Sequence, residues 1–256
     1  MNAMGDFERN GWCIVPHSAA VLDWAHAAYS HALIATQDPD KRREWLRHNG
    51  TWFVGVDALE NAGDGSISGV PLPTEGIADQ VSIPASWHRA QVSVVYEGYP
   101  RQSAQDTDVA HRFRVNRCSA HVDGLLGEGD PLERHLREPH DFILGLPLND
   151  VSACPLVVWD GSHRIMRAAF AETFDGVPPE TWGDLDVSAP YKAARKQCFD
   201  TLTSRQVVVR PGEMTLVDRH LLHGVAPMQD GETIPPEGRM IAYFRPEVAD
   251  ISDWLG

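Results

Sequence analysis

The sequence predicts a mainly β protein with flanking α-helices, folded as a double-stranded β-helix, the cupin-like jelly roll, with helical cover. Three observations favour this class. Short runs rich in Val and Ile recur between turns that contain Gly or Pro, which is typical of antiparallel strands. One long helical repeat stands near the start of the chain, and a second helical stretch interrupts the strands. Many short strands with grouped helices indicate a jelly roll.

A helix is predicted over residues 19–36, because apolar residues recur there at the spacing of one helix face. Ser18 supplies a cap at its start, and Pro39 limits its end. Three further helices are predicted, at 41–46, 164–170 and 191–202.

Strands are predicted at 12–16, 91–96, 112–121, 141–148, 155–159, 205–210, 213–223 and 239–244. Trp159, at the end of one of them, is expected in the core. A stretch rich in Gly, Ser and Pro at 62–78 is expected to be a surface loop, which either covers the mouth of a pocket or only connects its neighbours. Ser162 and His163 follow in a turn that could reach a bound substrate.

The composition is that of a soluble globular chain. With 256 residues, 43% of them apolar and 23% charged, a single domain over residues 1–256 with a substantial core is expected. The net charge of −14 argues against nucleic acid and anionic lipid as partners. The four cysteines are scattered without a Cys-x-x-Cys pair, so a reducing cytoplasm is expected. No apolar run approaches the roughly twenty residues of a membrane span, and the polar start at 1–10 does not resemble a targeting segment.

Candidate metal ligands occur in two places. His121 and Asp123 are two residues apart, so on a strand their side chains share a face and can bind one ion. His223, at the end of a distant predicted strand, would complete a set of two imidazoles and one carboxylate, which is the facial arrangement of non-haem Fe(II) sites. His220 is the alternative third ligand.

Further residues could bind an anionic ligand beside these. If the strand at 112–121 is regular, Arg117 and Ser119 share the face of His121 and look into the same cavity. Arg117 is then a candidate for holding an anion, although a surface ion pair is an equal alternative. Together Arg114 and Arg117 leave room for a small carboxylate or phosphonate as substrate.

The order of these motifs resembles the phytanoyl-CoA dioxygenase-like family of Fe(II)/2-oxoglutarate-dependent oxygenases. The resemblance covers most of the chain. It rests on the opening Phe7-Glu8-Arg9-Asn10-Gly11, the segment at 155–163 (Pro-Leu-Val-Val-Trp-Asp-Gly-Ser-His), the two ligand motifs His121-Val122-Asp123 and Leu222-His223-Gly224, and Arg239.

The resemblance implies that His121, Asp123 and His223 bind iron and that Arg239 holds the distal carboxylate of 2-oxoglutarate. A planar guanidinium suits that task because it forms a bidentate pair with a carboxylate. Arg245, six residues on, faces the same side of a regular strand and is the competing anchor. The sequence departs from the family at Val225, where a small hydroxyl residue is usual, and in a longer gap between His223 and Arg239.

The implied function is hydroxylation of a small-molecule substrate with dioxygen, in which 2-oxoglutarate is converted to succinate and CO₂. Two alternatives remain open. One is a cupin-type metal enzyme, such as an isomerase, that does not use 2-oxoglutarate; the other is a jelly roll that binds a ligand without catalysis. The sequence does not select a substrate or an oligomeric state.

Overall fold

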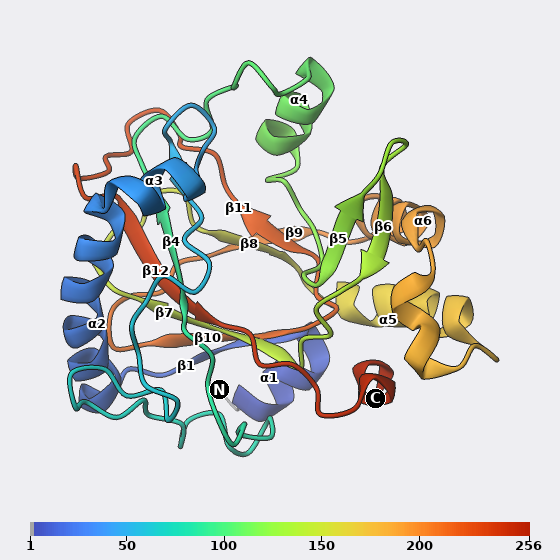
Figure 1. Ribbon diagram of the computed structural model, residues 1–256, viewed down its shortest axis with the longest axis horizontal. Helices are drawn as coiled ribbons and strands as arrows, with labels where there is room; N and C mark the ends of the chain where they lie inside the picture. Colours follow the sequence, from blue (N-terminus) through green and yellow to red (C-terminus); the bar gives the residue numbers. More distant parts are fainter. Residues whose placement is uncertain (1–2) are drawn as a thin grey trace.

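The computed structural model describes residues 3–256, and two antiparallel sheets that face each other form its centre (Figure 1). The larger sheet has seven strands, in the spatial order β1 (Trp12–Val15), β10 (Met214–Asp218), β7 (Phe142–Pro147), β12 (Arg239–Phe244), β4 (Gln91–Val95), β3 (Trp52–Phe53) and β2 (Leu46–Arg47). The smaller sheet has three, in the order β11 (His223–Val225), β8 (Leu156–Trp159) and β9 (Ser204–Val207). A separate hairpin pairs β5 (Leu125–Glu128) with β6 (Glu133–Leu136). The predicted jelly roll with helical cover is confirmed.

One helical layer covers the outer face of the larger sheet. Its main element is α2 (Ala19–Gln37), which lies along the left side of the sheet in Figure 1. Ser18 Oγ accepts a hydrogen bond of 3.2 Å from the backbone N–H of Val21 and so caps the first turn. Two shorter helices, α1 (Ala3–Asn10) and α3 (Pro39–Trp45), accompany it. The helices predicted at 19–36 and 41–46 are therefore confirmed.

A second layer packs against the smaller sheet and the hairpin. It contains α5 (Ser162–Phe174), α6 (Ser188–Thr201) and the short 3₁₀ helices η1 (Pro179–Asp184) and η2 (Ile251–Leu255). Trp159 is buried in this layer with Phe170, Tyr191 and Trp254, so its predicted place in the core is confirmed.

Side chains alternate along the strands, so that one set packs in the hydrophobic core beneath α2 and the other set faces the space between the sheets. On β12, Met240, Ala242 and Phe244 pack in the core with α2, whereas Tyr243 packs with residues of the smaller sheet. Because side chains alternate along a strand, Arg239 lies on the same inner face as Tyr243. The inner face of the larger sheet is thus available to form a pocket.

The strand predicted at 112–121 is wrong. Residues 108–116 form helix α4 (Asp108–Asn116), whose first turn is capped by Thr107 Oγ1, which accepts from the N–H of Ala110 at 3.1 Å. Alternating Phe113 and Val115 suggested a strand, but they gain no sheet partner. Cys118 and Ser119 then adopt left-handed backbone angles, with φ of 53° and 54°, and turn the chain before His121.

The strand predicted at 213–223 is divided in two. Asp218 ends β10 with a turn, in which its backbone oxygen accepts from Leu221 N and its carboxylate accepts from His220 N. The chain then enters β11 in the other sheet. This change of sheet brings His223 to the inner space.

The loop predicted at 62–78 is present, but it is anchored in the outer core. Ile67 and Ile77 are fully buried, and the indole N–H of Trp24 donates to the backbone oxygen of Gly65 at 2.9 Å. Among residues 3–256, no helix combines the length and the apolar character of a membrane span.

Candidate metal centre

A single backbone pairing brings the two histidines together. His121 and His223 form an antiparallel bridge in which each N–H donates to the other's carbonyl oxygen, at 2.8 and 3.0 Å. Their ring centres are 4.9 Å apart. The pairing extends the smaller sheet by one step and fixes both Cα atoms relative to each other.

Gly224 allows this close approach. A Cβ atom at this position would lie 2.1 Å from the carbonyl oxygen of Cys118 and 3.3 Å from the Cα atom of Ala120. Such a contact is impossible without moving one of the two segments. The glycine after His223 is therefore a packing requirement of the bridge.

The same local contact orients both imidazole rings. Nδ1 of His121 lies 2.9 Å from the carbonyl oxygen of Ser119, and Nδ1 of His223 lies 2.9 Å from that of Leu221. A carbonyl oxygen only accepts, so Nδ1 carries the proton in each ring. Nε2 is then the atom through which each ring, in its neutral form, would bind a metal ion.

Asp123 faces the two Nε2 atoms. Its Oδ1 is 3.0 Å from His121 Nε2 and 3.6 Å from His223 Nε2, and one ligand atom from each residue fits within 4.8 Å of the others. Two neutral imidazoles and a carboxylate on one side of a point are the donor set that suits non-haem Fe(II). The residues therefore fit the ion that the sequence suggested.

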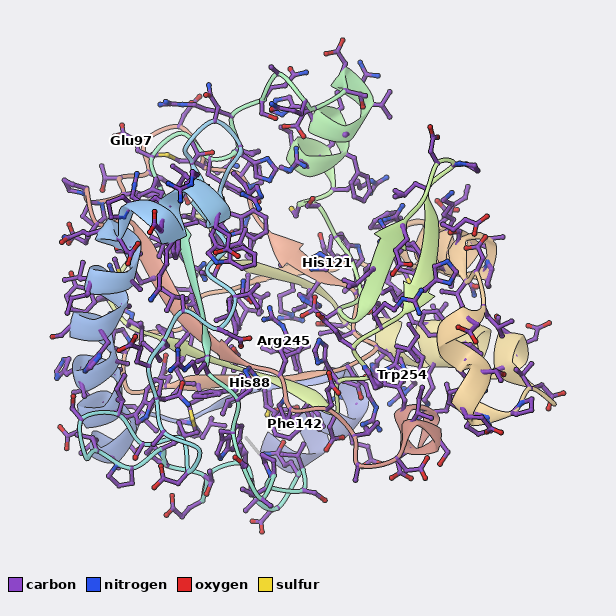
Figure 2. All side chains as sticks on the ribbon, in the orientation of Figure 1. His88, Glu97, His121, Phe142, Arg245 and Trp254 are labelled. Atoms are coloured by element: carbon purple, nitrogen blue, oxygen red, sulfur yellow. The ribbon has the colours of Figure 1, made fainter. Side chains whose placement is uncertain are left out.

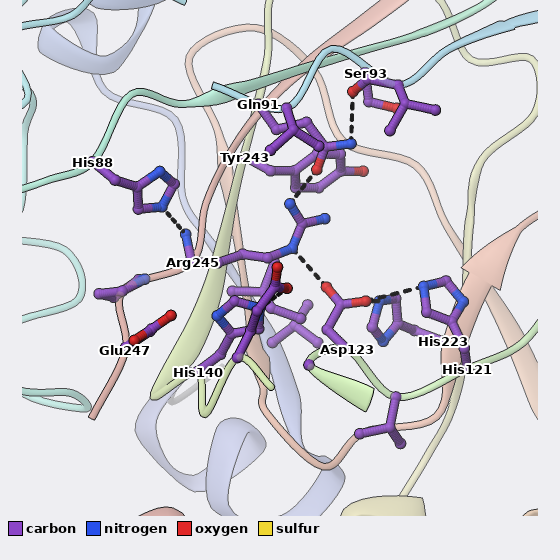
Figure 3. Close-up of a pocket in the computed structure, with 18 of the residues that line it drawn as sticks. His88, Gln91, Ser93, His121, Asp123, His140, His223, Tyr243, Arg245 and Glu247 are labelled. Atoms are coloured by element: carbon purple, nitrogen blue, oxygen red, sulfur yellow. Dashed lines mark hydrogen bonds and ion pairs between the residues drawn. The ribbon is translucent and has the colours of Figure 1, made fainter. Parts of the chain in front are cut away.

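Arg245 binds the other oxygen of Asp123 (Figure 3). Its Nε donates to Asp123 Oδ2 at 2.6 Å, and its Nη1 donates to Gln91 Oε1. The backbone N–H of Arg245 donates to His88 Nε2 at 2.7 Å. Arg245 thus holds Asp123 with Oδ1 directed at the imidazoles, and its own backbone and side chain are both fixed.

The charges around Asp123 keep it ionised. Burial opposes ionisation, but Arg245 and then His223 outweigh it and hold the pKa of Asp123 well below its usual value. Burial lowers the pKa of His223 to about 4, against the opposing charge of Asp123. Burial opposes protonation of His121 as well, but its hydrogen bond to Asp123 outweighs burial and raises the pKa of His121. Metal binding would therefore release the proton that His121 Nε2 shares with Asp123.

The three residues line a pocket of about 610 Å³ between the two sheets. Figure 2 shows His121 and Arg245 at the centre of the molecule, with His88 nearby. Apolar and small polar side chains from the inner faces of the strands form the walls: Trp52, Ser93, Ile143, Leu156, Val217, Val225 and Tyr243. No residue of the loop at 62–78 lines the pocket; Pro84, Ser86 and His88, further along the same connection, do so instead.

Arg239, the first residue of β12, lies apart from the metal ligands and, unlike Arg245, is not among the residues that line the main pocket. It is only 8% exposed, and among residues 3–256 its side chain makes no hydrogen bond or ion pair. Burial raises the pKa of Cys154 to about 12, and the charge of Arg239 opposes this rise. Burial also raises the pKa of Tyr99, and the charge of Arg239 is one of those that oppose that rise. A buried guanidinium without a counter-ion is therefore present on the inner face of the larger sheet.

The predicted strand position of Arg117 is wrong. Arg117 does not share a strand face with His121: it caps the C-terminus of α4, is exposed, and stacks over Phe199 with its Cζ 4.7 Å from the ring centre. Ser119 lies in a turn and not on a strand, and its carbonyl oxygen orients His121; it lines a second cavity together with His121. Neither residue lines the main pocket.

The remaining histidines near the motifs lie elsewhere. His220 is 1% exposed and packs edge-on against Trp254, with ring centres 4.4 Å apart; it is not in the group with Asp123. His163 is buried beside Gly11 and does not line the main pocket. Ser162 has a structural contact, because its Oγ accepts from the N–H of Leu222 at 2.8 Å and thereby fixes the approach to His223.

Sequence reasoning missed the polar partners of Arg245. Gln91 and His88 lie about 150 residues before Arg245 in the chain, at separations of 154 and 157. One signal was available for Gln91, which, like Ser93, is a polar residue in a strand otherwise made of Val. His140 also lines the pocket and pairs with Glu138 at 3.3 Å, and nothing in its local sequence indicated this.

The sequence matches no known family and no curated protein, but solved structures resemble the fold. SnoN, an epimerase from nogalamycin biosynthesis solved with Fe³⁺, alpha ketoglutarate and nogalamycin RO, is 15% identical with a TM-score of 0.50, over 95% of this chain and 81% of its own. EctD from S. alaskensis, solved with bound Fe, is 17% identical with a TM-score of 0.48, over 96% and 76%. SnoK, a carbocyclase from the same nogalamycin biosynthesis, is 13% identical with a TM-score of 0.47, over 95% and 83%.

At these identities the likeness concerns the fold. The agreement with SnoN spans nearly the whole described chain, including both sheets and both helical layers. We conclude that this chain has the jelly-roll fold found in the alpha ketoglutarate-dependent enzyme SnoN.

Proposed function

We propose that this protein is a non-haem Fe(II)- and 2-oxoglutarate-dependent dioxygenase, which hydroxylates a small-molecule substrate and releases succinate and CO₂. The observation that carries the proposal is the convergence of His121 Nε2, His223 Nε2 and Asp123 Oδ1 on one side of the pocket. Iron, 2-oxoglutarate and dioxygen, when bound, supply the oxidising chemistry of such a site. That SnoN was solved with iron and alpha ketoglutarate supports the same cofactors here.

The protein's own contribution is to orient the ligands before the ion binds. Backbone carbonyls hold the Nδ1 atom of each ring, so that both Nε2 atoms face Asp123, and Arg245 holds the second oxygen of Asp123. A carboxylate whose second oxygen is already occupied offers the ion one oxygen, which leaves the opposite side of the ion open for other ligands.

Arg239 is the proposed anchor for the distal carboxylate of 2-oxoglutarate, with Arg245 as the alternative. Arg245 already donates to Asp123 and Gln91, so its guanidinium is largely committed. Arg239 has no such partner, and a buried cation without a counter-ion favours binding of an anion. Val225 cannot add the hydrogen bond that a hydroxyl side chain would give.

An anaerobic titration tests the proposal. Fe(II) and 2-oxoglutarate added together should produce a weak visible charge-transfer band, and the His121→Ala variant should lose it. His220→Gln serves as the matched control, since His220 is also a buried histidine but lies outside the group. Metal binding without 2-oxoglutarate binding by calorimetry would contradict the dioxygenase proposal and favour a cupin-type metal protein.

Substrate turnover is the second arm. Succinate release above the uncoupled level, measured across a library of small molecules, should identify compounds that are oxidised. Mass spectrometry of the product then distinguishes hydroxylation, which adds one oxygen, from epimerisation, the reaction named for SnoN, which leaves the mass unchanged.

A further inference from the structure

A second cavity of about 560 Å³ adjoins the metal centre on the side away from the large sheet. It lies between α4, the β5–β6 hairpin and α6, which group at the upper right of Figure 1. Its wall shares His121, Val122 and Leu125 with the main pocket. A molecule that occupies both cavities would therefore pass beside a metal ligand.

Three arginines line this cavity: Arg114, Arg134 and Arg195. No Asp or Glu is among its lining residues. The main pocket has the opposite balance, since Asp57, Asp123, Glu138 and Glu247 accompany a single arginine there. An anionic group would thus find uncommitted cationic partners in the second cavity and mainly carboxylates in the first.

Two of the three guanidiniums have no carboxylate partner within residues 3–256. Arg134 donates from Nη1 to the backbone oxygen of Leu125 at 3.1 Å, and Arg195 makes only a long contact of 3.5 Å to the hydroxyl of Tyr191. Arg114 lies 3.3 Å from Asp106, but this Nη1 atom is buried and makes no hydrogen bond of good geometry. Donors for an anion are therefore present.

Aromatic rings hold the two unpaired guanidiniums in place. Arg134 and Arg195 both lie over Tyr191, with Cζ at 5.3 and 5.0 Å from the ring centre, and Arg195 also lies 4.7 Å from the ring centre of Phe113. Cation–π contacts restrict side chains that would otherwise be mobile. Two like charges near one ring repel each other, and an anion in the cavity that both arginines line would reduce this repulsion.

We propose that the arginine cavity binds an oxoanion group of the substrate, a phosphate or a carboxylate, while the rest of the molecule reaches the metal past His121. The assignment of this group to the substrate rests on the proposed function, but anion binding in the cavity can be tested without metal. The notable feature is a positively charged cavity that shares a wall with the candidate metal centre.

Calorimetry of the metal-free protein with inorganic phosphate, and separately with acetate, is the first experiment. Binding of either probe supports the site. Arg195→Gln should weaken it roughly tenfold, the loss of one charge-assisted hydrogen bond, and added salt should weaken it further. Arg112→Gln is the matched control, because Arg112 is an exposed arginine of the same helix as Arg114 and does not line the cavity.

The second experiment tests whether the bound phosphate lies close to the metal ion. With Mn(II) in the protein, the ³¹P relaxation of bound phosphate should be enhanced relative to the Zn(II) form, and the Arg134→Gln/Arg195→Gln double variant should lose the enhancement. Thermal melting shows that each variant is folded, and the single Arg195→Gln variant suffices if the double variant is not.

Three results would overturn the inference: no binding of either probe, equal affinities in Arg195→Gln and Arg112→Gln, or displacement of phosphate by one equivalent of 2-oxoglutarate. The last would assign the cavity to the co-substrate. If Arg195→Gln leaves the anion affinity intact while the Fe(II)/2-oxoglutarate band persists, only the substrate inference fails. Absence of the Fe(II)/2-oxoglutarate band in the wild-type protein, with phosphate binding intact, would contradict the dioxygenase proposal alone.

Discussion

Arg245 Nε lies 2.6 Å from Asp123 Oδ2, on the carboxylate oxygen that does not face the two imidazoles. The contact joins residues 122 positions apart in the sequence. The two carboxylate oxygens therefore have different roles: Oδ2 is held by Arg245, and Oδ1 faces the site where an ion would bind.

Arg245→Gln should therefore weaken metal binding. Loss of the partner of a metal-binding carboxylate typically costs about 10–100-fold in metal affinity, and Co(II) titration calorimetry measures it. Arg245→Lys should recover part of this affinity because it retains the charge. An unchanged Co(II) affinity, together with weaker 2-oxoglutarate binding, would instead assign Arg245 to the co-substrate.

Arg239→Gln should leave Co(II) affinity unchanged but weaken 2-oxoglutarate binding to the metal-loaded protein by roughly tenfold or more, because a charge-assisted bidentate pair is lost. Val225→Ser, which supplies a hydroxyl group beside the same region, should not weaken binding. Equal 2-oxoglutarate affinity in wild type and Arg239→Gln would show that the anchor is another residue.

Gly224→Ala should disturb the histidine bridge. The added Cβ atom would lie 2.1 Å from the carbonyl oxygen of Cys118, so the segments that carry His121 and His223 must separate. We expect lower metal affinity and a lower melting temperature. Gly63→Ala is the control, because Gly63 is exposed and an added Cβ atom there would meet only the side-chain oxygen of Ser86, at 3.1 Å. If Gly224→Ala retains full metal affinity, the bridge does not set the ligand geometry.

His220 should make the stability of the fold depend on pH. Burial, and then the charge of Arg219, holds the pKa of His220 well below its usual value, so the folded protein leaves this ring neutral. Below about pH 6.5 the histidine binds a proton in the unfolded chain but not in the folded protein. This group therefore lowers the free energy of unfolding by up to about 1.4 kcal/mol for each unit by which the pH falls. Stability is therefore gained above that pH and lost below it.

The His220→Phe variant tests this. Phe preserves the ring against Trp254, and His220 Nε2 has no hydrogen-bond partner to lose. Urea unfolding between pH 5 and 8, a range of roughly 1.5 units to either side of the usual histidine pKa, should show a shallower pH dependence than wild type. His26→Gln controls for the loss of an exposed histidine. A slope that stays the same in His220→Phe would remove His220 from the explanation.

Much of the fold could be predicted from the sequence because local signals agreed with the tertiary structure. The strand predicted at 239–244 is β12, with the same bounds, and the helix predicted from Ala19 is α2. At 112–121 two signals conflicted. The alternation of Phe113 and Val115 favoured a strand, but Thr107 caps a helix there, and this helical segment pairs with no strand. Alternation alone therefore cannot identify a strand.

The candidate site was predictable only in part. The His-x-Asp spacing and the distant His-Gly were visible in the sequence, and the structure brings His121, Asp123 and His223 together. The contacts of Arg245 depend on the registers of β4, β7 and β12, which no local pattern encodes. The arginine cavity likewise combines α4, β6 and α6, so it becomes visible only in the folded chain. The single domain over 1–256 stays a prediction.

The central claim is that three side chains hold one metal ion. Co(II) titration followed by visible absorption tests it most directly. We predict saturation at about one equivalent in wild type and in His220→Gln, and loss of the high-affinity signal in each of His121→Ala, Asp123→Ala and His223→Ala. Stoichiometric binding with an unchanged spectrum in all three alanine variants would contradict the account.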